Sequence, residues 1–343
     1  MRIGVDARHL DAGRGVAVYL EGMLGALSGD ELSLLVPGRE PLGPAARALA
    51  TRPDVRVVRT RVASRALFGS AAATGEPTLA RLLGVVDVLW IPAPAPVAPG
   101  DVPYVLTVHD RSFEERPRDF TPYERAWHRL ARPRALARGA AHVVTDTAVV
   151  RDELRAAWGL RRVTVVAPGV RRRTRTEPAG GEYVLFVGAL EPRKDPVAVA
   201  RAAAAAGVPA VFAGTGRLAG AVQAAGGEVR GRVSDGELDA LLAGALALVL
   251  PSHLEGFGFP PLEAALHGTP SVVSDLPVLR ETLGDDGALF VAPGDARGLT
   301  DAVRRLRGDP VLGLQLSAAA ARRAPSWDGA ARGLRAVLAE AAR

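Results

Sequence analysis

Short apolar runs alternate along the chain with longer stretches in which apolar residues recur at helical spacing. Short apolar runs bounded by turn residues are typical of strands buried in a parallel sheet, and the longer stretches are typical of helices that cover it. We therefore predict βαβ units in both halves of the chain. The predicted strands are residues 3–5, 32–36, 55–58, 86–91, 104–108, 142–145, 163–166, 183–187, 210–213, 247–250, 270–273 and 288–291, with a further strand near 229.

Helices are predicted for residues 15–27, 122–140, 148–157, 296–307 and 310–323. Two intervening segments break both patterns. Residues 61–76 are small, polar and interrupted by glycine, so they are predicted to form a surface loop, and the proline-rich residues 92–103 are predicted to be a connection.

A polar, arginine-rich segment interrupted by proline and glycine separates the two halves of the pattern. Its composition indicates a linker over residues 171–182. A chain of 343 residues is long enough for two domains that each bury a core. The predicted domains are residues 1–170 and 183–325.

One stretch late in the chain combines a turn with two carboxylates. Gly256 and Gly258 let the backbone approach a ligand closely, and a helix that begins near Phe259 would present amides that favour anions. Glu255 lies on the loop, while Glu263 lies one turn into that helix. The stretch therefore predicts a binding site. The alternative is that Glu263 only complements the helix dipole and Glu255 is an ordinary loop acid.

Two adjacent cations, Arg193 and Lys194, follow the strand predicted at 183–187 and precede a helix. Lys194 is the only lysine among 43 lysines and arginines. A compact ammonium group suits a phosphate in a tight pocket in a way that a planar guanidinium does not. The position predicts a phosphate contact, and the alternative is that this lysine remains by chance.

Composition narrows the function classes. Hydrophobic residues make up 48% and charged residues 23% of the chain, as in ordinary globular proteins. Cysteine is absent, which excludes disulfides and thiolate metal sites. The N-terminal apolar run is broken by charge and no long apolar segment follows, so we expect a cytoplasmic protein. The net charge of +6 favours anionic partners, yet aromatic residues are only 5% and the arginines are scattered, which argues against nucleic acid.

Seven residues separate the two carboxylates of the late turn, and residues 264–274 continue as a helix, a turn and a strand. This arrangement resembles the E-x7-E signature of glycosyltransferase family 4, a family of retaining enzymes. The resemblance implies an α/β fold of the GT-B type, in which two Rossmann-like, doubly wound parallel-sheet domains face a cleft. It also implies that the last helix, at about residues 326–343, packs back on the N-terminal domain.

The same resemblance implies a role for each part of a sugar-nucleotide donor site. Glu255 is implied to be catalytic beside the transferred sugar, and Glu263 to bind the ribose. The other implied donor contacts are Gly256, Phe257 and Gly258 on the sugar, Arg193, Lys194, Gly258 and Phe259 on the diphosphate, and Arg232 and Val233 on the base.

The first half carries a further candidate, His109, directly after the strand predicted at 104–108. Residues 108–110 and 123–127 resemble the corresponding segments of family 4, where the histidine lies against the sugar. His109 is thus implied to be catalytic. The alternative is a strand-end histidine that bonds to the backbone.

The glycine-bearing turn after the first strand implies an acceptor side at Gly15, Val16 and Tyr19. The family usually has a second glycine and an arginine where this chain has Ala17 and Val18. This departure weakens the assignment of phosphate contacts to the turn.

The activity implied is transfer of a hexosyl unit, of mannosyl or glucosyl type, from a nucleotide-diphosphate sugar to a hydroxyl acceptor, with retention. The acceptor would be a glycan, a lipid-linked glycan or a small metabolite, with peripheral contact to an anionic membrane left open. No Asp-rich metal motif is visible, and Arg193 with Lys194 can replace a divalent metal, so no metal or cofactor is expected. The alternatives are a GT-B sugar-nucleotide epimerase or phosphorylase, and an inactive nucleotide-sugar-binding homologue.

Overall fold

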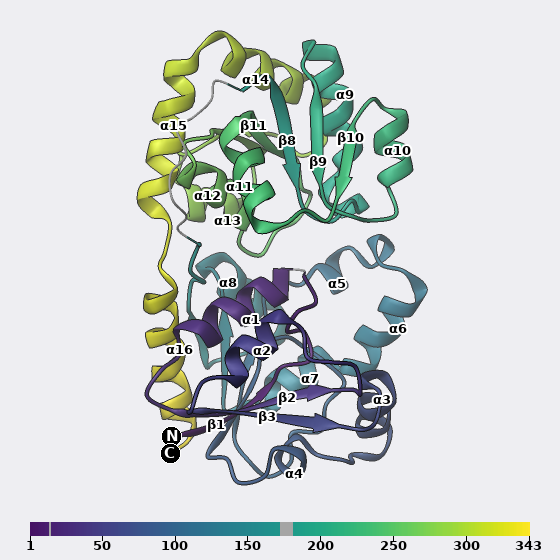
Figure 1. Cartoon of the computed structure of the whole chain (residues 1–343), viewed down its shortest axis with the longest axis vertical. Coiled ribbons are helices and arrows are strands. Elements are labelled where there is room, and N and C mark those ends of the chain that lie inside the picture. Colours follow the sequence, from purple (N-terminus) through teal and green to yellow (C-terminus); the bar gives the residue numbers. More distant parts are fainter. Residues whose placement is uncertain (14, 172–180) are drawn as a thin grey trace. The chain divides into compact units, whose positions relative to one another are not determined.

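The computed structural model describes residues 1–13, 15–171 and 181–343. These residues form two compact units, one of Met1–Gly169 with Pro325–Arg343 and one of Val170–Ala324 (Figure 1). Most of the linker predicted at 171–182 lies outside the described residues. Each unit is built on one parallel sheet with helices around it, which confirms the predicted α/β class.

The first unit holds a seven-stranded parallel sheet in the order β3-β2-β1-β4-β5-β6-β7. Because the strands are parallel, their carboxyl ends share one edge. The strand order reverses between β1 and β4, and such switch points are where open α/β sheets bind ligands. The strands are β1 (Arg2–Asp6), β2 (Glu31–Pro37), β3 (Val55–Thr60), β4 (Val88–Ile91), β5 (Tyr104–Thr107), β6 (His142–Thr145) and β7 (Val163–Val165).

The helices of the first unit correct two sequence predictions. The segment predicted as a surface loop contains α3, whose Leu67, Phe68 and Ala71 are buried, so a short apolar stripe outweighs the small residues around it. The single helix predicted at 122–140 is two helices, because Arg132 adopts a left-handed conformation with φ of 45° and Pro133 starts a new helix. The helices are α1 (Gly15–Ala26), α2 (Pro44–Ala50), α3 (Ser64–Thr74), α4 (Leu79–Leu83), α5 (Ser112–Glu115), α6 (Pro122–Ala131), α7 (Pro133–Gly139), α8 (Ala148–Trp158) and α16 (Trp327–Ala341).

The C-terminal helix α16 is part of the core of the first unit. Its Leu334 and Leu338 are fully buried in the cluster that also holds Leu20 of α1. Arg335 pairs with buried Asp30, with 2.5 Å between Nε and Oδ2. Apolar burial and this ion pair therefore both hold α16 to the unit that contains the N-terminus.

The second unit holds a six-stranded parallel sheet in the order β10-β9-β8-β11-β12-β13. Its strand order reverses between β8 and β11, so the loops that follow these two strands lie next to each other. The elements are β8 (Tyr183–Val187), α9 (Pro196–Ala206), β9 (Ala210–Ala213), α10 (Ala219–Ala224), β10 (Glu228–Gly231), α11 (Asp235–Gly244), β11 (Ala245–Leu250), α12 (Phe259–Leu266), β12 (Ser271–Ser274), α13 (Pro277–Leu283), β13 (Leu289–Val291), α14 (Ala296–Gly308) and α15 (Pro310–Arg323) (Figure 1).

Candidate active site

The loops after β8 and β11 bring Lys194 and Glu255 into contact. Lys194 Nζ lies 2.8 Å from Glu255 Oε1, and Ser252 Oγ donates to the same oxygen at 2.6 Å. Arg193 NH1 lies 3.9 Å from Glu255 Oε2 and donates to the Leu254 carbonyl at 2.7 Å. The structure thus joins two predicted diphosphate ligands to the predicted catalytic carboxylate.

The backbone fixes this contact from both loops. The His253 amide donates to the Arg193 carbonyl at 2.8 Å, which links the two loops directly. Gly188, at the end of β8, has φ of 142°, and a Cβ there would lie 3.3 Å from Lys194 Cδ. Glycine at this turn therefore keeps space beside the lysine side chain.

Glu255 is a buried anion that faces two cations. Its side chain is 8% exposed and that of Lys194 is 13% exposed. Burial alone would raise the pKa of Glu255, but the charges of Lys194 and Arg193 and the hydrogen bonds from Lys194 and Ser252 outweigh burial and lower the pKa. Glu255 is therefore ionised at neutral pH, and the network of Arg193, Lys194 and Glu255 carries one net positive charge.

Helix α12 starts directly after this cluster. Gly258 precedes it with φ of 90°, a left-handed conformation, and a Cβ at that position would press against Leu279. Phe259 and the two prolines that follow occupy the first turn, as predicted from the sequence. The amides at the start of the helix add a partial positive charge beside the two cations.

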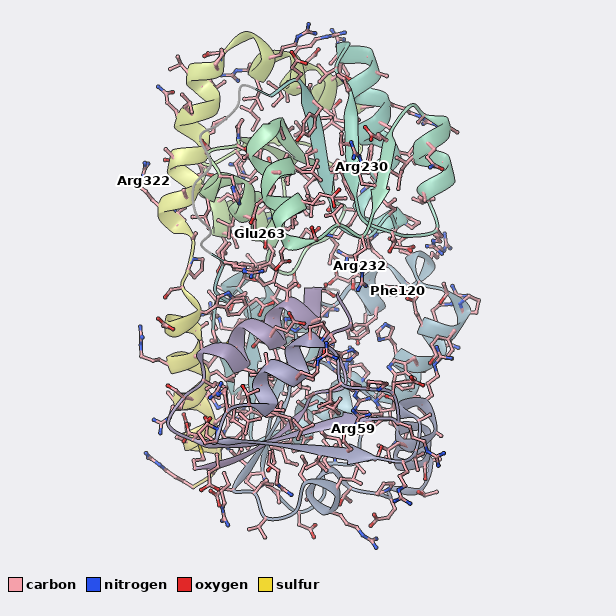
Figure 2. The ribbon with its side chains drawn as sticks, viewed as in Figure 1. Arg59, Phe120, Arg230, Arg232, Glu263 and Arg322 are labelled. Carbon is pink, nitrogen blue, oxygen red and sulfur yellow. The ribbon has the colours of Figure 1, made fainter. Side chains whose placement is uncertain are left out.

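The other predicted donor residues occupy separate positions in the second unit. Glu263 lies one turn into α12 and is half-buried, while Arg232 and Val233 follow β10, where Arg232 is exposed (Figure 2). Gly256 and Phe257 are buried in the turn between Glu255 and α12. Roles for these residues at the ribose, base and sugar stay predictions.

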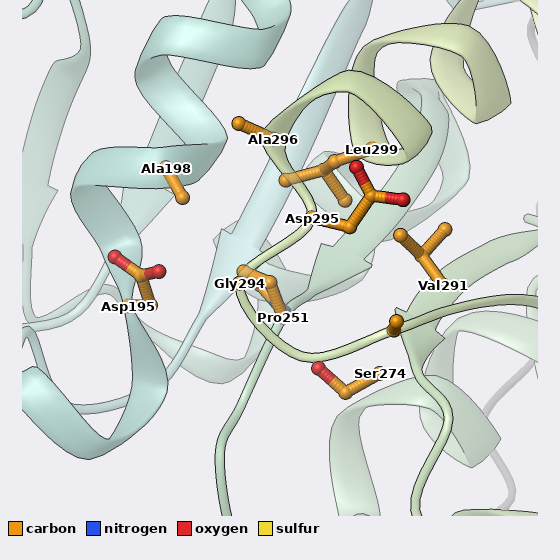
Figure 3. A pocket seen from close by; sticks show the side chains of 10 residues that line it. Asp195, Ala198, Pro251, Ser274, Val291, Gly294, Asp295, Ala296 and Leu299 are labelled. Carbon is orange, nitrogen blue, oxygen red and sulfur yellow. The ribbon is translucent and has the colours of Figure 1, made fainter.

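Sequence reasoning assigned no role to Ser252, which is completely buried and donates to Glu255. Its place just after a buried strand and three residues before a candidate carboxylate is the signal that could have identified it. Sequence reasoning also missed a small pocket beyond the carboxyl ends of β11, β12 and β13 (Figure 3). Asp195 and Asp295 line this pocket and no basic residue does, so it does not suit a diphosphate.

In the first unit, His109 follows β5 and contacts protein groups through both ring nitrogens. Nδ1 lies 2.7 Å from Asp146 Oδ2, and Nε2 lies 3.0 Å from the Pro92 carbonyl oxygen. Burial alone would lower the pKa of His109, but the Asp146 charge and hydrogen bond, with Asp110 and the Pro92 carbonyl, raise it. Sequence reasoning missed Asp146, although it directly follows the predicted strand 142–145.

The predicted acceptor-side residues differ in exposure. Gly15 opens α1 and is exposed, and Val16 is half-buried. Tyr19 is fully buried, its ring packs edge-on to His109 with 4.6 Å between centroids, and its hydroxyl lies 3.4 Å from Thr107 Oγ1. Tyr19 thus supports His109 from the core, and an acceptor role for the three residues stays a prediction.

The described residues lack a metal cluster and a membrane-spanning helix. Across residues 1–13, 15–171 and 181–343, no group of three or more His, Cys, Asp or Glu side chains is placed to hold a metal ion. None of the helices in the described part of the chain has the length and apolar character that crossing a membrane requires.

Two family models match consecutive parts of the chain. Residues 13–173 match the model described as Glycosyltransferase Family 4, and residues 171–326 match the model described as Glycosyl transferases group 1. The chain belongs to the family-4 type of glycosyltransferases. The resemblance read from the E-x7-E signature is thereby confirmed.

Curated relatives of this glycosyltransferase match over part of their length. The O-antigen chain mannosyltransferase RfbU of Salmonella typhimurium is 46% identical over 78 residues, which are 23% of this chain and 22% of RfbU. A glycogen synthase of Mycobacterium tuberculosis is 35% identical over 216 residues, which are 56% of this chain and 51% of the synthase. The chain therefore spans about half the length of these relatives or less.

Solved structures share the fold along the whole chain. The sucrose-phosphate synthase of Thermosynechococcus elongatus has a TM-score of 0.74 at 18% identity and covers 99% of this chain and 98% of its own. The Anabaena protein HepE in complex with UDP-glucose has a TM-score of 0.75 at 17% identity and covers 99% of this chain and 100% of its own. These similarities and the two parallel-sheet units establish the GT-B fold that was predicted.

Proposed function

We propose that this protein is a retaining glycosyltransferase that moves a hexosyl unit, of mannosyl or glucosyl type, from a nucleotide-diphosphate sugar to a hydroxyl acceptor. The observation that carries the proposal is the network of Arg193, Lys194 and Glu255 where the strand order of the second sheet reverses. The names of the relatives support the sugar type, since one is a mannosyltransferase and one solved neighbour holds UDP-glucose.

The network suits the departure of a diphosphate. Negative charge grows on the leaving oxygens as the bond to the anomeric carbon breaks, and fixed cations lower the energy of that state. Arg193, Lys194 and the amides at the start of α12 would supply this stabilisation. A diphosphate bound there would take over Lys194 from Glu255, which frees the carboxylate to face the sugar.

Two cations at one turn also support metal-independent transfer. In enzymes that use a divalent metal for this kind of transfer, the metal neutralises the diphosphate. Arg193 and Lys194 would provide two positive charges at that position. We therefore propose that no metal or other cofactor is needed. Retention of the anomeric configuration is proposed from family membership. The spacing of two carboxylates, which predicts the stereochemical outcome in glycosidases, does not apply here because this network holds one carboxylate.

The acceptor is proposed to be a hydroxyl group of a glycan, a lipid-linked glycan or a small metabolite. RfbU is named for the O-antigen chain, and the solved structure of TarM, at 13% identity, holds fondaparinux, α-GlcNAc-glycerol and UDP. A cytoplasmic location and peripheral contact to an anionic membrane are part of the proposal, and the net charge of +6 supports the membrane contact.

The test is a thermal-shift series with GDP, UDP, ADP and dTDP, each with and without EDTA. We expect one nucleotide to raise the melting temperature, to the same extent with EDTA. The shift should disappear in Lys194→Ala and persist in Arg322→Ala, which removes an exposed cation from α15 in the same unit (Figure 2). Equal shifts in both variants, or a shift that EDTA abolishes, would contradict the assignment.

A further inference from the structure

The two hydrogen bonds of His109 determine its charge. A neutral imidazole has one N–H and one lone pair, so it donates from one nitrogen and accepts at the other. The Pro92 carbonyl oxygen can only accept, and it lies 3.0 Å from Nε2. Asp146 Oδ2 lies 2.7 Å from Nδ1, and an ionised carboxylate also only accepts. Both contacts are satisfied together when both ring nitrogens carry a proton.

The proton between His109 and Asp146 belongs on the imidazole. Burial raises the pKa of Asp146, but the pKa of His109 is raised as well and starts from a higher reference value, about 6.5 against about 3.9, so the ring is the stronger base. The Asp146 side chain is 3% exposed, and its Oδ1 has no hydrogen-bond partner within the part of the chain that the structure describes. His109 is therefore the group that compensates the buried charge of Asp146.

Each group that surrounds His109 either favours the protonated, positively charged imidazole or is neutral toward it. Asp146 follows β6 and Asp110 follows His109 itself, and both bring negative charge. The Pro92 carbonyl follows β4, and the ring of Tyr19 from α1 packs edge-on. In the strand order β4-β5-β6, Pro92 and Asp146 follow the two strands that neighbour β5, and His109 follows β5 itself.

We propose that Asp146 is a positioning residue that keeps His109 doubly protonated, so that His109 acts as a fixed positive charge and not as a base. A general base needs a free lone pair, and this geometry leaves none on the ring. In the proposed transfer reaction, this fixed charge would stabilise negative charge that develops close to His109. The role in transfer rests on the proposed function, whereas the protonation state of His109 does not.

The protonation state can be measured by NMR on the full chain labelled with nitrogen-15 histidine. Comparison with His109→Gln assigns the His109 signals among the six histidines. At about pH 7.5 we expect both ring nitrogens of His109 to be protonated in the native protein. A single protonated nitrogen at that pH would overturn the proposal, and this result needs no variant of Asp146.

The dependence on Asp146 is tested with Asp146→Asn, which keeps the side-chain shape and removes the charge. We expect the His109 titration to move down by about one pH unit or more. The control Asp87→Asn removes a carboxylate that pairs with Arg2 at the opposite, amino end of the same sheet, and it should leave the titration unchanged. An unchanged His109 titration in Asp146→Asn would also overturn the proposal.

The role in transfer needs a rate profile between about pH 5.5 and 8.5. In Asp146→Asn, kcat should fall about tenfold at neutral pH and recover as acid restores the proton on His109. A pH-independent loss of kcat would contradict the fixed-charge role. If the native protein transfers no sugar from any donor, the proposed function fails, and the NMR experiment still decides the protonation of His109.

Discussion

Each unit buries a carboxylate of its candidate site at the carboxyl edge of a parallel sheet, and these two carboxylates have different partners. Glu255 in the second unit faces two cations, whereas Asp146 in the first unit faces a single imidazole. Burial raises the pKa of both. The cations reverse this effect for Glu255, whose pKa is lowered, while His109 does not reverse it for Asp146, whose pKa is raised.

This difference separates two kinds of site. The Glu255 network has an excess of cations that can exchange a carboxylate for a diphosphate, so it suits a ligand. The Asp146 pair is closed, because both nitrogens of His109 are already engaged with protein groups. We therefore propose ligand binding for the Glu255 network and a fixed charge for the pair of Asp146 and His109.

The largest expected effect is that of Lys194→Ala. Removing one preorganised charge at a leaving group lowers the rate about 100- to 1,000-fold, and this is the loss we expect in kcat/KM. The free energy of unfolding should fall by on the order of 2–3 kcal/mol, because Glu255 stays buried with a weaker set of partners. Steady-state kinetics and urea unfolding measure both, with Arg322→Ala as the matched control. Native kcat/KM in Lys194→Ala would contradict the diphosphate assignment.

A second variant separates binding from turnover. Glu255→Gln keeps the side-chain shape and removes the negative charge, so Arg193 and Lys194 become available to a nucleoside diphosphate. We expect about a 100-fold loss in kcat, with a Kd for the diphosphate that is unchanged or lower. Calorimetric titration beside the kinetic assay measures the two quantities. Weaker diphosphate binding in this variant would mean that Glu255 holds the ligand and does not compete with it.

The two networks should respond oppositely to pH. The folded pKa of Glu255 is lowered, so its contribution to stability is present above the unfolded value of about 4.3 and is lost as pH falls through the folded pKa. The folded pKa of His109 is raised, so its contribution is complete below about 6.5 and is lost as pH rises through the folded pKa.

Urea unfolding of the native protein, Glu255→Gln and Asp146→Asn over a pH series checks this prediction. The stability difference caused by Glu255→Gln should shrink on acidification, and that caused by Asp146→Asn should shrink on alkalinisation. If both stability differences change in the same direction with pH, Glu255 and His109 do not have the opposite pKa shifts that we infer from their partners.

The smallest expected effect is that of Ser252→Ala. Ser252 donates one of the hydrogen bonds to Glu255 Oε1, and Lys194 contacts the same oxygen. Loss of one such bond costs about 1 kcal/mol, so we expect a fall in kcat of about fivefold. The same kinetic assay measures it, and a loss as large as that in Lys194→Ala would show that the serine matters more than the cation.

Local pattern predicted much of the fold. The strand at 210–213, the helix Pro310–Arg323 and the start of α12 at Phe259 appear where the sequence placed them. The helix α3 was missed because only three of its residues are buried among small and polar ones. The break at Arg132 was missed although Pro133 signals it, because a proline inside a helical pattern ends or kinks the helix at the preceding residue.

The sequence predicted which residues belong to the candidate site, but not which of them contact one another. Arg193, Lys194 and Glu255 were identified from their turns and from the family resemblance. That Lys194 contacts Glu255 depends on β8 and β11 being neighbours, although they are distant in sequence. The pairing of His109 with Asp146 depends in the same way on β5 lying beside β6. Strand order is a tertiary property, so local pattern alone could not supply it.

The most direct test of the central claim is an NMR assay of sugar transfer in EDTA. The native protein is incubated with sugar nucleotides of the base identified by thermal shift and with hydroxyl acceptors, and the anomeric proton of the product is followed. The account predicts a product with the anomeric configuration of the donor, formed by the native protein and by Arg322→Ala but not by Lys194→Ala. An inverted product, or transfer that EDTA abolishes, would contradict it.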